Sequence, residues 1–199
     1  AVVVPPEEGL ELPPRVTRRM RLAALLSPVA AATNAAFIAP DEVETGRAAV
    51  KHLAALGHRR ILHLTYARDA TGIRDRTRGY EEAMRELGET PRVLPAPDRE
   101  TMDKALRSAK ATALFCHNDW LALQAIQWLG ELRLRVPEDV SVLGVDASPT
   151  FAALHPSLSS FAYPREAIAA RVAKWILEQD LPGEPLRLTP VAGTTVRSA

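Results

Sequence analysis

The chain has 199 residues, of which 47% are hydrophobic and 25% are charged, a composition typical of a globular protein with a sizeable core. Its 25 Lys and Arg residues nearly balance its 24 Asp and Glu residues, so the net charge of +1 gives no general reason to expect nucleic-acid or acidic-membrane binding. The single cysteine, Cys116, excludes an internal disulfide and a four-cysteine metal site.

The first residues of the chain and the lengths of its apolar runs indicate where in the cell the protein is located. Residues 1–14 carry four prolines and three glutamates, which is unlike the charged and apolar regions of a secretory signal. No apolar run approaches the ~20 residues that a membrane-spanning helix requires. We therefore expect a cytoplasmic protein with no membrane partner.

The first part of the chain predicts short strands followed by helices. Residues 1–4 form an apolar run stopped by two prolines, which predicts a strand. The spacing of apolar residues over 15–26 predicts a helix, and residues 28–32 and 35–39 predict two further short strands. A helix is then expected from about Val43 to Gly57, where the glycine ends it.

The rest of the chain continues this alternation. Apolar runs predict strands at 61–66, 93–94, 113–116, 140–145 and 158–163, with two more short strands after Leu186. Helical periodicity is centred on 80–87, 100–108, 121–132 and 168–176. Repeated strand–helix units with continuous apolar strands are typical of parallel sheets covered on both faces, so the sequence predicts an α/β fold.

Polar side chains follow three of the predicted strands. Arg76 lies beyond the loop after 61–66, Asn118 comes after 113–116, and Asp146 ends the run 140–145. In open parallel sheets, ligands bind beyond the carboxyl ends of the strands, so these three side chains are expected to converge if the strands are neighbours. A guanidinium, an amide and a carboxylate with roughly cancelling charge suit a neutral polyol better than a phosphate or a metal.

Each of these residues also has an ordinary structural explanation. Asn118 or Asp119 has the right position to cap the helix that follows. Asp146 is suited to shaping the turn that contains Pro149, and Arg76 is compatible with a solvated helix face. These alternatives stay open at the level of the residues alone.

Other function classes find little support. Cys116 and His117 are adjacent in a predicted strand, so their side chains point to opposite faces and cannot form a catalytic pair. The five histidines include no HExxH motif, and no Gly-rich phosphate loop is present. Four arginines within residues 15–21 fit a solvated helix face better than a DNA contact. We expect neither an enzyme nor a metal or cofactor site.

Five runs together resemble a known family. They are "GHRRILHL", "RDRTRGYEEAMRELG", "ATALFCHNDWLALQAIQWL", "VPEDVSVLGVDASP" and "PSLSSFAYPREAIAARVAKWIL". In this order they are similar to the effector-binding core of LacI/GalR-type (lactose-repressor family) transcription regulators, over about residues 41–199. The resemblance implies a periplasmic-binding-protein-like fold of two Rossmann-like subdomains with parallel sheets that close over a small molecule. It also implies a homodimer and an upstream helix-turn-helix domain that binds operator DNA.

The resemblance also assigns residues and boundaries. Arg76 falls on the ligand-binding arginine of the family, Asn118 on the asparagine of its Asn-Asp pair, Asp146 on the aspartate after "VLGV", and Tyr163 on a position in the cleft. The implied subdomains are residues 1–57 plus 163–185 and residues 58–162 plus 186–199. About two strand–helix units of the family's first subdomain have no counterpart here, so that subdomain is expected to be incomplete and the chain truncated at its start. A sugar-binding protein of a transport system, which shares this fold, is the alternative.

Overall fold

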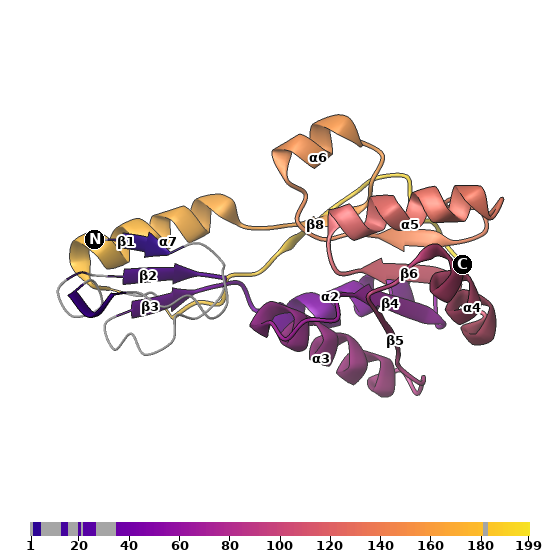
Figure 1. The fold of residues 1–199 in the computed structure, drawn as a ribbon, viewed down its shortest axis with the longest axis horizontal. Coiled ribbons are helices and arrows are strands. Elements are labelled where there is room, and N and C mark those ends of the chain that lie inside the picture. Colours follow the sequence, from indigo (N-terminus) through magenta and orange to yellow (C-terminus); the bar gives the residue numbers. More distant parts are fainter. Residues whose placement is uncertain (1, 5–12, 16–19, 21, 27–34, 181–182) are drawn as a thin grey trace.

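The computed structural model describes residues 2–4, 13–15, 20, 22–26, 35–180 and 183–199. Figure 1 shows these residues in two lobes. One lobe contains strands β1 to β3 and helix α7, and the other contains the remaining elements. The chain passes between them in the segments that follow β3, β8 and α7.

The smaller lobe is built on a parallel sheet. Its strands are β1 (Val2–Val4), β2 (Leu22–Leu25) and β3 (Ala35–Ile38), in the order β1-β2-β3. Helix α7 (Arg165–Glu178) packs on one face, and the Trp175 indole Nε1 donates to the Leu22 carbonyl oxygen at 2.7 Å. This side-chain bond anchors the helix to the central strand of the described sheet.

The prediction of a helix over residues 15–26 is wrong for residues 22–25. Residues 22–25, which we expected to be helical, form strand β2 and pair with strands on both sides. A four-residue apolar run is compatible with either structure by periodicity, and here the two neighbouring strands satisfy its backbone groups. The strand expected at residues 28–32 lies outside the described residues.

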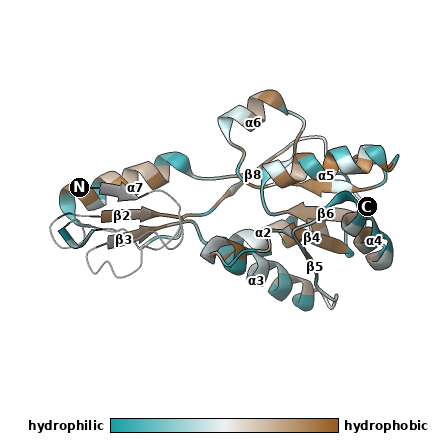
Figure 2. Ribbon diagram, viewed as in Figure 1, coloured by the Kyte–Doolittle hydropathy of each residue, from teal (hydrophilic) through white to brown (hydrophobic). Residues whose placement is uncertain are grey.

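The larger lobe contains a four-stranded parallel sheet. Strands β4 (Ile61–Thr65), β5 (Arg92–Pro95), β6 (Ala113–Cys116) and β7 (Ser141–Leu143) are arranged β5-β4-β6-β7. Each strand is parallel to its neighbours, so the prediction of an α/β fold with parallel sheets is confirmed. Figure 2 shows the strands as mainly hydrophobic, whereas helix α3 alternates between hydrophobic and hydrophilic positions.

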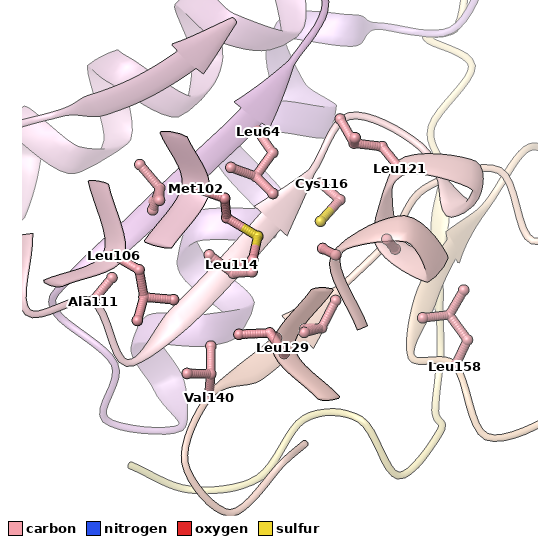
Figure 3. Packing of buried hydrophobic residues seen from close by; sticks show 14 residues of the cluster. Leu64, Met102, Leu106, Ala111, Leu114, Cys116, Leu121, Leu129, Val140 and Leu158 are labelled. Atoms are coloured by element: carbon pink, nitrogen blue, oxygen red, sulfur yellow. The ribbon is translucent and has the colours of Figure 1, made fainter. Parts of the chain in front are cut away.

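Helices cover both faces of this sheet. Helices α4 (Arg99–Ala109) and α5 (Asp119–Glu131) cover one face, where Leu64 and Leu114 pack among their side chains (Figure 3). Helices α2 (Glu42–Ala55) and α3 (Thr71–Glu86) cover the other. We expected α2 in the first subdomain, but it packs with α3 and the second sheet. The division of the chain into subdomains therefore stays a prediction, with this helix reassigned.

A short antiparallel pair joins the lobes. Strand β8 (Ser160–Ala162) pairs with β9 (Thr189–Val191). Isolated parallel bridges, Leu143 with Ser159 and Asp146 with Ala162, connect the start and end of this segment to β7 and the residues after it. Helix α6 (Pro149–Leu154), where we expected only a turn, begins with Ser148 as its N-cap. Of the two strands expected after Leu186, only β9 is present in the described part of the chain. No helix within the described ranges is both long and apolar enough to cross a bilayer.

Candidate functional site

The candidate site lies at the carboxyl ends of three adjacent strands. Strand β4 leads to Tyr66, β6 leads to His117 and Asn118, and β7 leads to Asp146. Because β4, β6 and β7 are parallel neighbours in the sheet, these residues occupy one edge. The expectation that these strand ends meet at one edge is confirmed.

Arg76 is buried at this edge, with a side chain that is only 2% exposed. Its guanidinium group donates from Nε and Nη2 to Glu42 Oε2, at 2.9 and 2.6 Å. Nη2 also donates to Tyr163 Oη at 2.7 Å, and Nη1 donates to the His117 carbonyl oxygen. Four of the five N–H groups of an arginine are therefore engaged by the protein, and one remains. The solvated-face explanation of Arg76 is excluded.

Glu42 reaches Arg76 because helices α2 and α3 pack unusually closely. The helices meet at Gly46 and Gly79, where a Cβ atom on either glycine would collide with the backbone of the other helix. Glu42 is the first residue of α2, directly after the N-cap Asp41, whose side chain accepts from the Glu44 amide. The cap and the two glycines thus determine which carboxylate faces Arg76.

Tyr163 completes this network at the start of the segment that crosses to α7. Its hydroxyl group accepts from Arg76 and donates to Glu42 Oε1 at 2.7 Å. Burial raises the pKa of the Tyr163 hydroxyl above its ordinary value, so the hydroxyl keeps its proton. Glu42, Arg76 and Tyr163 therefore form a closed ring of hydrogen bonds between two helices and a crossover segment. We call these three residues the crossover triad.

Asn118 is the N-cap of helix α5. Its Oδ1 atom accepts from the Leu121 amide at 3.1 Å and from the Tyr66 hydroxyl at 2.8 Å. The capping explanation is therefore confirmed for Asn118 and wrong for Asp119, which is the first helical residue. Among the described residues, no acceptor bonds the Asn118 amide nitrogen, which retains two N–H donors.

Asp119 holds the turn after β7 in place. Its carboxylate accepts from the Ala147 amide at 2.8 Å and from Ser160 Oγ at 2.5 Å. Gly144 makes room for this carboxylate, because a Cβ atom there would collide with Asp119 Oδ1. Burial raises the pKa of Asp119, and the two hydrogen bonds oppose that shift.

Asp146 has an unusual backbone and a largely free carboxylate. Its φ angle of 116° lies in a region that residues with a side chain rarely adopt. The backbone is held by its amide, which donates to the Phe161 carbonyl oxygen at 2.9 Å, and by Arg165, which donates to the Asp146 carbonyl oxygen at 2.6 Å. No donor in the described part of the chain bonds its carboxylate.

The charges around Asp146 set its protonation. Burial raises its pKa to about 7, Arg76 opposes the rise, and the carboxylates of Asp119 and Glu42 add to it. Asp146 thus changes charge near neutral pH. It accepts hydrogen bonds as a carboxylate above that pH and offers a donor below it.

The arrangement suits recognition better than chemistry. Arg76 and Tyr163 are bound to each other and to Glu42, while Asp146 and the amide nitrogen of Asn118 retain free bonding capacity. The described residues include no cluster of three or more His, Cys, Asp or Glu side chains that would hold a metal. Cys116 is buried in the core beside Leu114, and burial raises the pKa of its thiol, so it is not an activated nucleophile.

Sequence analysis overlooked Glu42, Tyr66 and Arg165. Glu42 reads as an ordinary acidic residue in a first helical turn, where carboxylates favour the helix dipole. Only the crossing of α2 over α3 gives it a buried partner, 34 positions along the chain. Tyr66 is the last residue of a predicted strand and was therefore identifiable, whereas no pattern in the sequence indicated Arg165.

Comparisons with known proteins agree with this fold. A family model described as "Periplasmic binding protein-like domain" matches residues 50–196. The HTH-type transcriptional repressor PurR of Aliivibrio fischeri (strain MJ11) is 34% identical over 153 residues, covering 71% of this chain and 45% of the repressor. The chain thus spans less than half the length of that relative.

Solved structures show the same architecture. A LacI transcriptional regulator from a Rhodococcus species superposes with a TM-score of 0.78 at 21% identity, covering 98% of this chain and 77% of that protein. A LacI family regulator from Enterococcus faecium with bound ribose gives a TM-score of 0.74 at 21% identity, covering 89% and 71%. At this identity the superpositions establish the fold alone.

Proposed function

The chain belongs to the periplasmic binding protein-like family as the effector-binding core of a LacI-type regulator, and from this premise we propose that it binds a small neutral, sugar-like ligand between its lobes. The proposal rests on the backbone conformation of Asp146 and on its unbonded carboxylate. This residue is held in a strained backbone conformation at a strand end, with a carboxylate that no described donor bonds. Such strain persists where the surrounding structure enforces it, and it clusters at ligand-binding positions.

The chemistry of the site supports a ligand rich in hydroxyl groups. Asp146 supplies acceptor oxygens and Asn118 supplies N–H donors, which is the pairing that a hydroxyl group can satisfy from both sides. Above pH 7, where Asp146 is ionised, the site has three carboxylates, those of Glu42, Asp119 and Asp146, and two guanidinium groups, those of Arg76 and Arg165. This balance disfavours an anionic ligand.

Arg76 and Tyr163 take a different part in the proposal. Their polar groups already bond Glu42 and each other, so they position the crossover segments and offer the ligand only the remaining N–H of Arg76. Arg76 and Asp146 both belong to the larger lobe, so a ligand held by them would favour one arrangement of the lobes through the contacts it also makes with the smaller lobe. Its differential affinity for two arrangements would then shift their populations.

The wider role follows from the relatives. We propose that the chain acts in the cytoplasm as a homodimer and transmits this shift to operator DNA through an upstream domain, without performing a reaction. The regulators among its relatives favour this role over that of a transport receptor. Sedimentation of the purified protein at micromolar concentration tests the dimer, and a strictly monomeric species would contradict it.

The ligand proposal is tested by a thermal-shift screen of sugars, polyols and nucleobases, since a ligand that binds the native state raises its melting temperature. Calorimetry then measures each hit on the wild type and on Asp146→Asn, which removes the charge with little change in shape. We expect at least a tenfold loss of affinity above pH 7.5. Asp103→Asn, on helix α4 and paired with Arg107, is the matched control and should bind normally. Equal affinity in both variants, or no hit at all, would refute the proposal.

A further inference from the structure

A polar cavity lies at the end of the larger sheet opposite the candidate site. It has a volume of about 210 Å³ and opens beside Ile61, the first residue of β4, and Arg92, the first residue of β5. The candidate site is at the carboxyl end of β4, five residues further on, or roughly 16 Å along an extended strand. The cavity is therefore separate from the candidate site.

Three arginines from two segments line this cavity. Arg59 and Arg60 come from the turn before β4, and Arg92 comes from the start of β5. Glu89 is the one carboxylate-bearing residue in the lining, so the lining carries three positive charges and one negative charge. None of the three forms an ion pair within 4.0 Å in the described part of the chain, although eight other arginines do.

The backbone on which these arginines stand is held firmly. The hydroxyl group of Tyr80, which is fully buried, accepts from the Arg92 amide at 3.0 Å and donates to the Ile61 carbonyl oxygen at 2.7 Å. The carbonyl oxygen of Arg60 accepts from the Thr112 amide at 2.9 Å. On the other side of Arg59, the His58 ring bonds Thr112 Oγ1 and the Arg197 carbonyl oxygen, each at 2.9 Å. The backbone from which the three arginine side chains extend is thus fixed, so binding an anion would require ordering of the side chains alone.

The remaining lining suits a phosphate group carried by a small molecule. Ile61 and Met84, each about 1% exposed, form an apolar floor, which strengthens charge interactions above it. Thr90 adds a hydroxyl group to the lining. Arg60 uses Nε to bond the Lys110 carbonyl oxygen at 2.5 Å, which leaves its terminal nitrogens available. Arginine binds phosphate oxygens in a planar, bidentate manner, and lysine does not.

We propose that this cavity binds the phosphate group of a phosphorylated small molecule, as a second site independent of the effector cleft. Its volume far exceeds the roughly 10–15 Å³ that one water molecule requires, so a phosphate with part of its carrier fits. A single concave site with three arginines matches one phosphate group. A nucleic acid would instead need an extended row of basic residues.

The test is calorimetric titration of the purified chain with inorganic phosphate at pH 7.5, with the ionic strength held constant by sodium chloride. We expect saturable binding with one site per chain, and binding at least tenfold weaker in the double variant Arg59→Gln/Arg92→Gln. The matched control is Arg133→Gln, at an exposed arginine just beyond helix α5 that has no carboxylate within 4.0 Å in the described part of the chain; it should bind like the wild type. Thermal unfolding of each variant shows whether its fold is intact.

Further variants and ligands in the same titration distinguish specific phosphate binding from attraction to charge alone. Arg59→Lys/Arg92→Lys, which keeps the charge, should bind phosphate several-fold more weakly than the wild type, because lysine lacks the bidentate geometry. Ribose 5-phosphate should bind at least as tightly as phosphate, and Asp146→Asn should leave both affinities unchanged. The proposal is overturned if phosphate does not bind, if Arg133→Gln is equally impaired, or if Asp146→Asn alone abolishes binding. It is also overturned if a random DNA duplex displaces phosphate and the ester does not bind.

Discussion

The crossover triad gives a sharp test of how this chain connects its lobes. Glu42→Gln keeps the size of the side chain and one acceptor oxygen but removes the charge that faces Arg76. The pair is buried, with exposed fractions of 2% for Arg76 and 9% for Glu42. Breaking a buried ion pair from one side costs about 3–5 kcal/mol, because the remaining charge is left without a counter-charge. Since glutamine still accepts a hydrogen bond, we expect a loss near ~3 kcal/mol.

The magnitude is measurable by urea unfolding and by calorimetry. For a chain of this size, ~3 kcal/mol corresponds to a fall in melting temperature of about 6–12 °C. The matched control is Glu82→Gln, which breaks the partly exposed pair between Glu82 and Arg47 on the same two helices. Exposed pairs contribute about 0–1 kcal/mol, so this variant should unfold nearly as the wild type does.

A double-mutant cycle then isolates the interaction itself. Arg76→Met removes the guanidinium group, and the double variant Glu42→Gln/Arg76→Met lacks both partners. If the pair acts as described, the double variant should be more stable than the sum of the two single losses predicts. Additive losses, or equal effects of Glu42→Gln and Glu82→Gln, would refute the buried pairing and the role assigned to the triad.

Three further predictions concern packing, pH and DNA. Gly79→Ala should destabilise the fold by more than about 3 kcal/mol in urea unfolding, since its Cβ would collide with the α2 backbone, whereas Gly72→Ala, which meets nothing within 4 Å, should be neutral or stabilising. The pKa of Asp146 is raised to about 7 in the folded state, so its contribution to stability is present below the unfolded pKa near 4 and is lost as pH rises to 7. Between pH 5 and 7 the free energy of unfolding of the wild type should therefore fall by up to ~1.4 kcal/mol per pH unit relative to that of Asp146→Asn. A constant difference between the two proteins over that range would contradict this. In gel-shift assays residues 1–199 should not bind duplex DNA in a sequence-selective, salt-resistant manner, given a net charge of +1; such a complex would show that the chain carries its own recognition surface.

Much of the larger lobe was predictable from local patterns. Its strands are continuous apolar runs and its helices have clear periodicity, so the order of elements and the shared edge of Asn118 and Asp146 followed from the sequence. The choice between Asn118 and Asp119 as N-cap was not predictable, because it depends on which residue has an extended backbone. In the smaller lobe, the run at 22–25 is too short for periodicity to separate strand from helix.

The main features missed by sequence analysis depend on contacts between elements. Arg76 was predicted as a site residue, but its burial and hydrogen bonding depend on its contact with Glu42. That contact exists only because Gly46 and Gly79 let helices α2 and α3 approach closely. Neither glycine has an evident role until the crossing is known. Because Glu42 balances the charge of Arg76, the polar groups at the site that lack a partner among the described residues are the Asp146 carboxylate and the Asn118 amide nitrogen. The position of two glycines thus changes which side chains are free to meet a ligand, and under the function proposed above the charge of Asp146 is the quantity that should control recognition.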